Sequence, residues 1–272
     1  METSLHRLVR GRAGLRVIGD VHGMAEDFAA AVHGAIAANL AVCVLGDIID
    51  YGNDSPRCME IAHAIVRDGA GIIVPGNHDA KFLRWIRGHR INIKPEGLGE
   101  TIRQLRAHPN GIGISHRFAE TMAAMPIWQT VGDRAFVHAG FHPEMIGRNG
   151  QPIGNIGRPD RIANLALNGE TYGDHDDDGK NIRTYGWAKL IPEGMTVYIG
   201  HDVISKEKIV MNEEEGGGTV AHMDTGSGEG GRLSWMDIDA DEMEERRRGV
   251  KRRRGGRGRG RRDDRDGTKP AT

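Results

Sequence analysis

Three short apolar runs in the N-terminal third of the chain each end in a glycine that is followed by residues able to bind metals or move protons. These residues are Asp20 and His22 after the first run, Asp47 and Asp50 after the second, and Asn77 and His78 after the third. An apolar run that stops at a glycine is typical of a buried strand that ends at the edge of a sheet. The pattern therefore predicts that these six side chains meet at one place.

Two later segments add histidines in the same setting. His138 follows the apolar run 135–137, and His201 follows the run 196–199 and Gly200. Carboxylate and amide oxygens mixed with imidazole nitrogens suit manganese, iron or zinc. Each motif alone is also explained by a turn or by an acid that caps a helix. Their occurrence together, each after an apolar run, favours a metal site.

The elements that must position these residues follow a strand–helix–strand–helix–strand order. Strands are expected at 15–18, 41–45 and 72–74, with helices at 25–38 and from Ser55 to before Gly69. This alternation predicts an α/β layered domain. The later expectations are helices at 79–87, 101–106 and 117–125, a hairpin of 128–131 with 134–137, and strands at 196–199, 208–212, 219–223 and 232–238. Residues 143–194 are rich in Gly, Asn and Asp and show no clear periodicity.

The formal charge of -1 hides an asymmetry along the 272 residues. Residues 244–272 contain 13 basic and 5 acidic residues, whereas residues 1–243 contain 24 basic and 33 acidic ones. The basic tail has no apolar face to bury and alternates Arg with Gly, so we expect it to be disordered. Two interpretations of it stay open, a solvated extension without a partner and a nonspecific contact with nucleic-acid phosphates.

Cysteine usage and hydropathy indicate the cellular compartment in which the protein is expected. Cys43 lies in an apolar strand pattern and Cys58 in a predicted helix, so both are expected to be reduced packing residues. The first twelve residues lack the apolar segment of a secretory signal, and no run is long enough to span a bilayer. We therefore expect a cytoplasmic protein without membrane contact.

The ordered motifs resemble those of the calcineurin-like metallophosphoesterase superfamily, and within it the phosphoprotein-phosphatase branch. The resemblance covers about residues 15–238 and extends to bacterial serine/threonine phosphatases, symmetrical diadenosine tetraphosphatases and the phosphatase module of bacterial polynucleotide kinase-phosphatases. It implies a four-layer α/β/β/α sandwich with a small helical excursion. The expected organisation is an N-terminal extension (1–14), a metallophosphoesterase domain (15–242) and a disordered Arg/Gly-rich basic tail (243–272).

The resemblance also implies a role for each residue of the motifs. Two divalent cations, manganese first with iron or zinc as alternatives, would be bound by Asp20, His22, Asp47, Asn77, His138 and His201. Asp47 would bridge the two metals, and a hydroxide shared between them would attack phosphorus. His78 would act as a general acid at the leaving oxygen, and Asp50 would orient it.

One position departs from the pattern of the superfamily. Tyr51 stands where the related motif usually has an arginine that grips the substrate phosphate with two parallel hydrogen bonds, which a tyrosine cannot make. Hydrolysis is expected to survive, while protein phosphatase activity is the expectation that this change weakens most. Arg183 is a candidate replacement donor for substrate binding, although a solvated loop arginine is the favoured interpretation.

These observations predict a metal-dependent phosphoric ester hydrolase with a phosphorylated substrate. The first expectation is a serine/threonine-phosphatase-like enzyme. The alternative is a nucleotide or RNA-end phosphatase acting on dinucleoside polyphosphates or 2′,3′-cyclic phosphates. A non-catalytic nucleic-acid-binding protein built on the same fold is a further alternative, which the basic tail keeps open.

Overall fold

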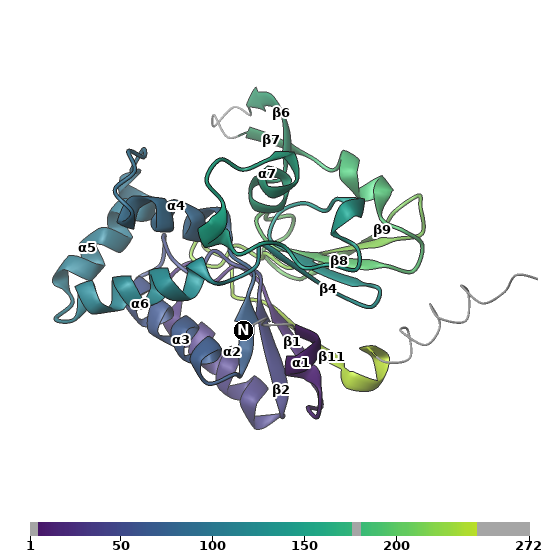
Figure 1. Cartoon of the computed structure of the whole chain (residues 1–272), viewed down its shortest axis with the longest axis horizontal. Coiled ribbons are helices and arrows are strands. Elements are labelled where there is room, and N and C mark those ends of the chain that lie inside the picture. The colour runs from purple at the N-terminus through teal and green to yellow at the C-terminus, as the bar shows by residue number, and fades with distance from the viewer. Residues whose placement is uncertain (1–4, 176–180, 244–272) are drawn as a thin grey trace, which may run out of the picture.

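The computed structural model describes residues 5–175 and 181–243 (Figure 1). The predicted disordered tail therefore lies almost entirely outside the described residues. Two β-sheets form the centre, one with strand order β11-β1-β2-β3 and the other with strand order β4-β5-β8-β10-β9. A separate two-stranded hairpin, β6-β7, completes the strands.

The first sheet is built from the strands that precede the N-terminal motifs. Its members are β1 (Gly14–Ile18), β2 (Leu40–Val44), β3 (Gly71–Ile73) and β11 (Trp235–Asp239). Strands β1, β2 and β3 are parallel, and β11 runs antiparallel to β1. The three parallel strands therefore end at the same edge, as the motif spacing predicts. Every residue of β1, β2 and β3 is buried, which explains why these strands are apolar apart from Arg16, whose guanidinium pairs with Asp237.

Two amphipathic helices pack against this first sheet, as Figure 1 shows. They are α2 (Ala25–Ala37) and α3 (Ser55–Arg67). Helix α3 begins where predicted because the Asp54 carboxylate accepts a hydrogen bond from the Arg57 amide and Pro56 occupies the first turn. The buried face of α2 includes Phe28, which is fully buried.

The second sheet carries the later motifs in the same way. Its members are β4 (Trp128–Val131), β5 (Arg134–Val137), β8 (Thr196–Ile199), β9 (Val210–Glu213) and β10 (Thr219–His222). Strands β5, β8 and β10 are parallel, so β5 and β8 end at the same edge. The predicted hairpin and the strand 196–199 have the expected bounds.

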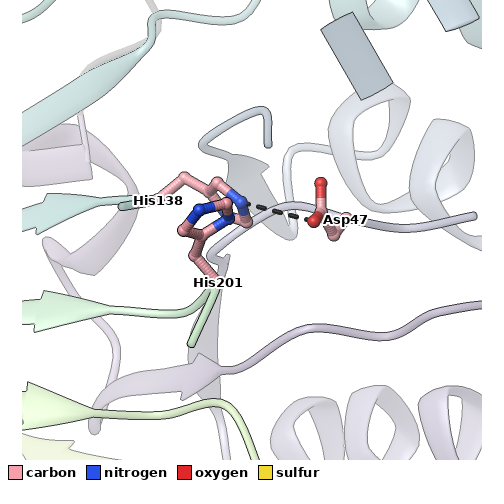
Figure 2. A group of neighbouring side chains, drawn as sticks. All are labelled: Asp47, His138 and His201. Carbon is pink, nitrogen blue, oxygen red and sulfur yellow. Dashed lines mark ion pairs between the residues drawn. The ribbon is translucent and has the colours of Figure 1, made fainter. Parts of the chain in front are cut away.

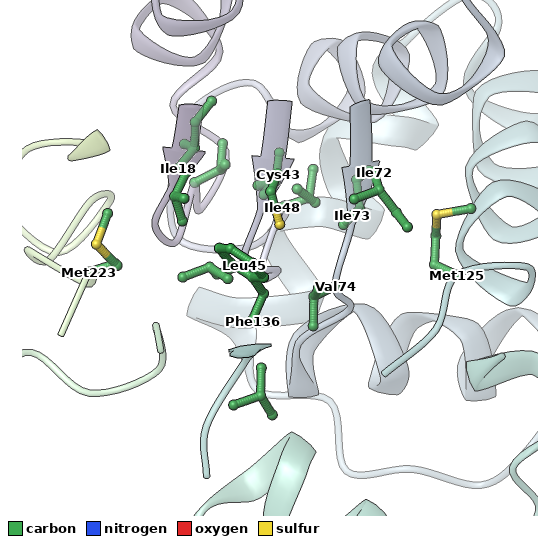
Figure 3. Packing of buried hydrophobic residues seen from close by; sticks show 14 of the residues in the cluster. Ile18, Cys43, Leu45, Ile48, Ile72, Ile73, Val74, Met125, Phe136 and Met223 are labelled. Carbon is green, nitrogen blue, oxygen red and sulfur yellow. The ribbon is translucent and has the colours of Figure 1, made fainter. Parts of the chain in front are cut away.

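The core fills the space between the two sheets (Figure 3). Ile18, Leu45 and Val74 from the first sheet and its strand ends face Phe136 of β5, and all four are fully buried. The ring of Phe136 stacks on that of Tyr198, with centroids 5.1 Å apart. The packing of Ile18, Leu45 and Val74 against Phe136 fixes the position of the first sheet relative to the second. It therefore also fixes one set of strand ends relative to the other.

A helical excursion lies between β3 and β4. It consists of α4 (Asn77–Ile86), the turn η1 (Pro95–Gly99), α5 (Glu100–Ala107) and α6 (Gly111–Ala123). The excursion is larger than the sequence predicts, because α4 starts at Asn77 rather than residue 79 and α6 starts at Gly111 rather than residue 117. Phe82 of α4 packs edge-on against Phe118 of α6, which ties the two helices together.

Several elements were not predicted from the sequence. They are α1 (Leu5–Val9), α7 (Arg161–Asn168), β6 (Glu170–His175), β7 (Asn181–Thr184) and the short helices η2 (Pro143–Met145), η3 (Ile153–Asn155) and η4 (Gly186–Leu190). Helix α7 does have a local signal, because Asp160 caps it by accepting from the Ala163 amide and the apolar spacing of 162, 163, 166 and 167 is helical. Leu5 of α1 is fully buried and its amide donates to Gln129, so α1 is anchored on β4.

The two sheets with helices outside them confirm the predicted four-layer α/β/β/α architecture (Figure 1). Helices α2 and α3 form one outer layer, and α7 with the β6-β7 hairpin lies beyond the second sheet. In the described residues, no helix has the length and apolar character needed to cross a membrane. The assignment of residues 1–14 and 243–272 as regions separate from the domain stays a prediction.

We predict that Phe136→Ala lowers the free energy of unfolding by about 3–5 kcal/mol, because it removes a fully buried ring between the sheets. Chemical denaturation followed by circular dichroism measures this loss. The matched control is Ile112→Ala in α6, whose side chain is 81% exposed and which should change stability by less than about 0.5 kcal/mol. Equal effects of the two substitutions would contradict the packing described above.

Candidate metal centre

The six residues expected to bind metal lie in loops or helix starts directly after strands of both sheets. They are Asp20 and His22 after β1, Asp47 after β2, Asn77 after β3, His138 after β5 and His201 after β8. Because β1, β2 and β3 are parallel, as are β5 and β8, the structure brings the two sets of strand ends together. These residues therefore lie together where the strands of the two sheets end, and their roles as metal ligands stay a prediction.

Hydrogen bonds between the loops hold them in place. The Asp47 carbonyl accepts from the amides of Val21 and His22, at 3.1 and 2.8 Å. The Asp20 carboxylate accepts from the His201 amide, with both oxygens within 3.1 Å, and so joins the two sheets. The Asp47 Oδ1 atom accepts from the His78 amide at 2.9 Å. Each carboxylate therefore braces a loop as well as facing the centre of the site.

The backbone of these loops adopts conformations that side chains usually avoid. Of the six non-glycine residues with a positive φ in the described parts of the chain, five are at this site: His22, Asp47, Asp50, Tyr51 and His201. The left-handed region is disfavoured for residues with a Cβ atom, and such residues cluster at functional sites. The surrounding hydrogen bonds and packing hold the loops in this conformation.

The first group of candidate ligands comprises Asp20, His22 and Asp47, whose ligand atoms all lie within 4.8 Å of one another. The His22 Nε2 atom is 3.9 Å from an oxygen of each carboxylate. Its Nδ1 atom is 3.0 Å from the Ile49 carbonyl, which can only accept. The proton of a neutral ring is therefore assigned to Nδ1, and the Nε2 lone pair faces the two carboxylates.

The second group comprises Asp47, His138 and His201, again with all ligand atoms within 4.8 Å (Figure 2). The His138 Nε2 atom is 3.3 Å from Asp47 Oδ2 and 3.0 Å from Asn77 Oδ1. Its Nδ1 atom is held by the Leu45 carbonyl at 2.6 Å. Burial lowers the pKa of His138, but Asp47 outweighs it and raises that pKa, so without a metal a proton on Nε2 joins these atoms. A metal cation between the same atoms would take the place of that proton.

The electrostatics of the site also favour positive charge. Burial raises the pKa of Asp20 well above its usual range, and the nearby Asp224 and Asp47 raise it further. Burial also raises the pKa of Asp224. Burial would raise the pKa of Asp47 as well, but His138 and His78 outweigh it and hold that pKa well below the usual range. Among the residues that the structure describes, no Lys or Arg contributes to the pKa shifts of these three carboxylates, so a metal cation would offset their charge.

His201 gives an independent indication of fit. Its Nε2 atom is buried and, among the residues that the structure describes, has no hydrogen-bond partner. Burial lowers the pKa of His201 well below its usual value, and the neighbouring His138 lowers it further, so the ring is neutral. A neutral imidazole with a buried, unpaired nitrogen is the form that binds a metal. The donor set of the two groups therefore fits divalent cations.

His78 lies beside the candidate ligands and is held by Asp50. The His78 Nδ1 atom is 2.6 Å from Asp50 Oδ2, and the ring is 17% exposed. Burial alone would lower the pKa of His78, but Asp47 and the hydrogen-bonded Asp50 outweigh it and raise the pKa to about 9. The pair is arranged as a proton donor oriented by a carboxylate.

Three polar residues near this centre were not assigned a role from the sequence. The Thr101 hydroxyl, from α5, donates to Asp50 Oδ1 at 2.7 Å and is fully buried. The Asp79 carboxylate accepts from the amides of Gly76 and Ile48. Asp224 lies close enough to Asp20 to raise its pKa. Two of them have a signal in the sequence, because Asp79 follows His78 in the third motif and the segment Asp224-Thr225-Gly226 also fits the superfamily. Thr101 has none, because it is too distant in sequence from the motifs.

Tyr51 and Arg183, the two candidates for substrate binding, lie at different places around the centre. The Tyr51 ring packs against His22 and His78, with centroids 4.8 and 5.3 Å apart. Arg183, in β7, donates to the Asn168 carbonyl at 2.6 Å and lowers the pKa of His201 through its charge. Tyr51 therefore borders the site directly, whereas Arg183 is partly occupied by a backbone contact.

A family model for calcineurin-like phosphoesterases matches residues 15–213. The chain belongs to the calcineurin-like phosphoesterase family. This result confirms the predicted family and shows a phosphoester hydrolase. Members of the family use divalent metal ions, which agrees with the donor atoms gathered at the strand ends.

Proteins with similar sequences are named bis(5′-nucleosyl)-tetraphosphatases. A bis(5′-nucleosyl)-tetraphosphatase PrpE (asymmetrical) from Geobacillus sp. strain WCH70 is 27% identical over 194 residues, which covers 70% of this chain and 72% of the relative. The protein of the same name from Geobacillus thermodenitrificans is 26% identical over 232 residues, 80% of this chain and 87% of the relative. These calcineurin-like relatives are therefore named for action on a nucleotide.

Solved structures share the fold. One of a candidate diadenosine tetraphosphatase has a TM-score of 0.52 at 18% identity, covering 85% of this chain and 95% of that one. One of a cold-active protein-tyrosine phosphatase from a psychrophilic Shewanella has a TM-score of 0.50 at 13% identity, covering 85% and 76%. At these identities the likeness concerns the fold alone.

We predict that Gly200→Ala disrupts metal binding. A Cβ atom at residue 200 would lie 1.9 Å from Asp20 Oδ1, so the carboxylate must move away from His22 and Asp47. The affinity for Mn²⁺, measured by isothermal titration calorimetry, should fall at least about tenfold. Gly157→Ala is the control, because its Cβ would meet nothing within 4 Å. Unchanged affinity in Gly200→Ala would show that Asp20 is not a ligand.

Proposed function

We propose that this phosphoesterase uses two divalent cations, manganese being the first candidate, to hydrolyse a nucleotide polyphosphate such as a dinucleoside tetraphosphate. The observation that carries the proposal is the pair of ligand groups that share Asp47, each with its donor atoms within 4.8 Å. The nucleotide substrate is supported by the relatives, which are named bis(5′-nucleosyl)-tetraphosphatase. Location in the cytoplasm and a nucleic-acid contact of the basic tail stay predictions.

The residues that would hold the cations divide into two sets with one member in common. Asp20 and His22 would hold one cation, Asn77, His138 and His201 would hold the other, and Asp47 would contribute to both. When bound, the cations supply Lewis acidity, which lowers the pKa of an attacking water and offsets negative charge on the phosphoryl group. Manganese is favoured because the set mixes carboxylate and amide oxygens with imidazoles.

The chain supplies the proton for the leaving group through His78. Since Asp50 holds Nδ1 of His78, Nε2 is the nitrogen left to give a proton to the leaving oxygen. Asp50 and Thr101 fix the direction of the ring, and the hydrogen bond to Asp50 favours its protonated form. The partial exposure of the ring places it where a substrate can reach it.

Tyr51 makes a phosphoprotein substrate the weaker expectation. Its single hydroxyl cannot form the two parallel hydrogen bonds by which a guanidinium grips a phosphate monoester. Burial raises the pKa of Tyr51 to about 12, so at neutral pH the hydroxyl is a neutral donor. A substrate with several phosphates depends less on one such grip, because other charges share its binding.

We predict that Asp47→Asn abolishes metal-dependent turnover. The change removes charge from the one carboxylate common to both ligand groups, so Mn²⁺-dependent hydrolysis of p-nitrophenyl phosphate and of diadenosine tetraphosphate should fall at least about 100-fold. Absorbance and chromatography of the products measure the two rates. Asp27→Asn, in the exposed part of α2, is the control. Wild-type protein without Mn²⁺-dependent hydrolysis of either compound would overturn the proposed function.

We predict that the effect of His78→Asn depends on the leaving group. A general acid matters most for a leaving group that is a strong base, so kcat for phenyl phosphate should fall about 10²–10⁴-fold. The rate for p-nitrophenyl phosphate, whose leaving group needs little protonation, should fall much less. Steady-state assays of both esters at one pH decide this. An equal loss for the two esters would show that His78 acts by another route, such as phosphate binding.

We predict that Thr101→Val lowers kcat about tenfold with a smaller change in KM, because it removes the hydroxyl that orients Asp50 without touching the substrate. Thr101→Ser keeps the hydroxyl and should restore most of kcat. A thermal melt of each variant separates this effect from loss of fold. If Thr101→Ser were as slow as Thr101→Val, packing of the methyl group rather than the hydrogen bond would be the cause.

A further inference from the structure

A large cavity opens directly beside the candidate metal centre. It has a volume of about 940 Å³ and is lined by α4, the segment 89–92, the segment 153–159 that includes η3, and the end of α7. Asn77, whose Oδ1 atom faces His138 at the metal centre, is also one of the lining residues. Asn77 therefore borders both the cavity and the metal centre.

The charges lining this cavity are all of one sign. Its ionised side chains are Lys81, Arg84, Arg87, Arg90 and Arg158, and within residues 5–175 and 181–243 no Asp or Glu lines it. Among the residues that the structure describes, none of these five forms an ion pair, although 33 acidic residues lie in the first 243 positions. An uncompensated cluster of cations on an otherwise acidic body attracts anions and concentrates them locally.

The cations are arranged so that they lead away from the metal centre. Lys81 and Arg84 follow Asn77 by four and seven residues, so they lie on the same face of α4. With a rise of 1.5 Å per residue, the helix from Asn77 to Arg87 covers about 15 Å. Arg158 lines the cavity from the segment after η3, and Arg87 donates to the Gly154 carbonyl at 3.1 Å, which holds the two walls together.

Part of the remaining lining is apolar. Ile91, Ile153 and Ile156 line the cavity, with Ile153 buried and the other two half-buried. An apolar surface next to a row of cations suits a ligand that carries several phosphates at one end and a flat base at the other. The volume lies within the usual range for small-molecule sites, which favours a nucleotide over a polymer.

We propose that this cavity binds the part of a nucleoside polyphosphate that extends beyond the scissile phosphate, with Lys81, Arg84 and Arg158 contacting the distal phosphates and the isoleucines contacting the nucleoside. The inference rests on the proposed function, because it places the reacting phosphate at the metal centre. It assigns substrate selection to residues outside the metal motifs. In a chain that has Tyr51 in place of an arginine, these cations would supply the charge for phosphate binding.

The test compares a substrate that fills the cavity with one that does not. For Arg84→Glu and Arg158→Glu, the ratio of kcat/KM for diadenosine tetraphosphate to kcat/KM for p-nitrophenyl phosphate should fall at least about tenfold, mainly through KM. Arg84→Lys should recover part of the ratio. Arg106→Glu, an exposed arginine of α5 that does not line the cavity, is the matched control and should leave the ratio unchanged. A ratio that stays within twofold in both cavity variants overturns the inference.

A binding measurement separates this inference from the proposed function. Inorganic tripolyphosphate is titrated calorimetrically into the full chain without added divalent cations, because binding to the arginines does not require turnover. The wild type should bind it, and the double variant Arg84→Glu/Arg158→Glu should bind at least about tenfold more weakly, with steep loss of wild-type affinity as salt is raised.

Mn²⁺-dependent hydrolysis of p-nitrophenyl phosphate together with no tripolyphosphate binding would overturn the inference and leave the metal centre intact. A larger loss for a phosphorylated oligonucleotide than for diadenosine tetraphosphate in these variants would also overturn it, in favour of a polymeric substrate.

Discussion

The arrangement of the whole site depends on one buried carboxylate. The Oδ2 atom of Asp47 faces both His22 and His138, and the Oδ1 atom accepts a hydrogen bond from the His78 amide. It therefore sets the distance between the two ligand groups and the start of the helix that carries the proton donor. A buried carboxylate in this position requires positive charge or hydrogen-bond donors nearby. This requirement explains why imidazoles and backbone amides converge on Asp47.

The fold holds this carboxylate in place at a cost in backbone strain. Residues such as Asp47, Asp50 and His201 have left-handed backbone conformations that hydrogen bonds between loops must stabilise. Glycines at key points remove steric obstacles, since a Cβ on Gly76 would lie 2.1 Å from Asp47 Oδ1. Short parallel strands packed through Phe136 provide the rigid base from which these loops depart. Strain at the site is thus balanced by the apolar packing beneath it.

Much of this arrangement could be predicted from the sequence, for identifiable reasons. The strands β1, β2 and β3 are fully buried, so their apolar runs and terminal glycines mark them clearly, and each motif follows directly in sequence. The sequence predicts the hairpin β4-β5 equally well, because its turn at Gly132 is short. The relation between the two sheets came only from the resemblance to a family, since periodicity does not specify which strands from distant parts of a chain pack together.

What the sequence did not predict depends on contacts between distant segments. Thr101 joins Asp50 from a helix whose local pattern indicates only an amphipathic surface. Helix α7 is short and follows a stretch rich in Gly and Asn, so its cap at Asp160 was not recognised. The cavity beside Asn77 is formed by residues 81–91 and 153–159, and neither segment alone indicates a binding surface. Such features become visible only when the chain is folded.

The contact between Asp20 and the His201 amide joins positions 181 residues apart. In the folded chain this contact depends on the docking of the two sheets, because β1 and β8 belong to different sheets. Closing so long a loop costs conformational entropy, which the packing between the sheets must offset. Cation binding in this family member consequently reports on the integrity of the entire sandwich and adds to its thermodynamic stability, since an unfolded chain offers no comparable chelator.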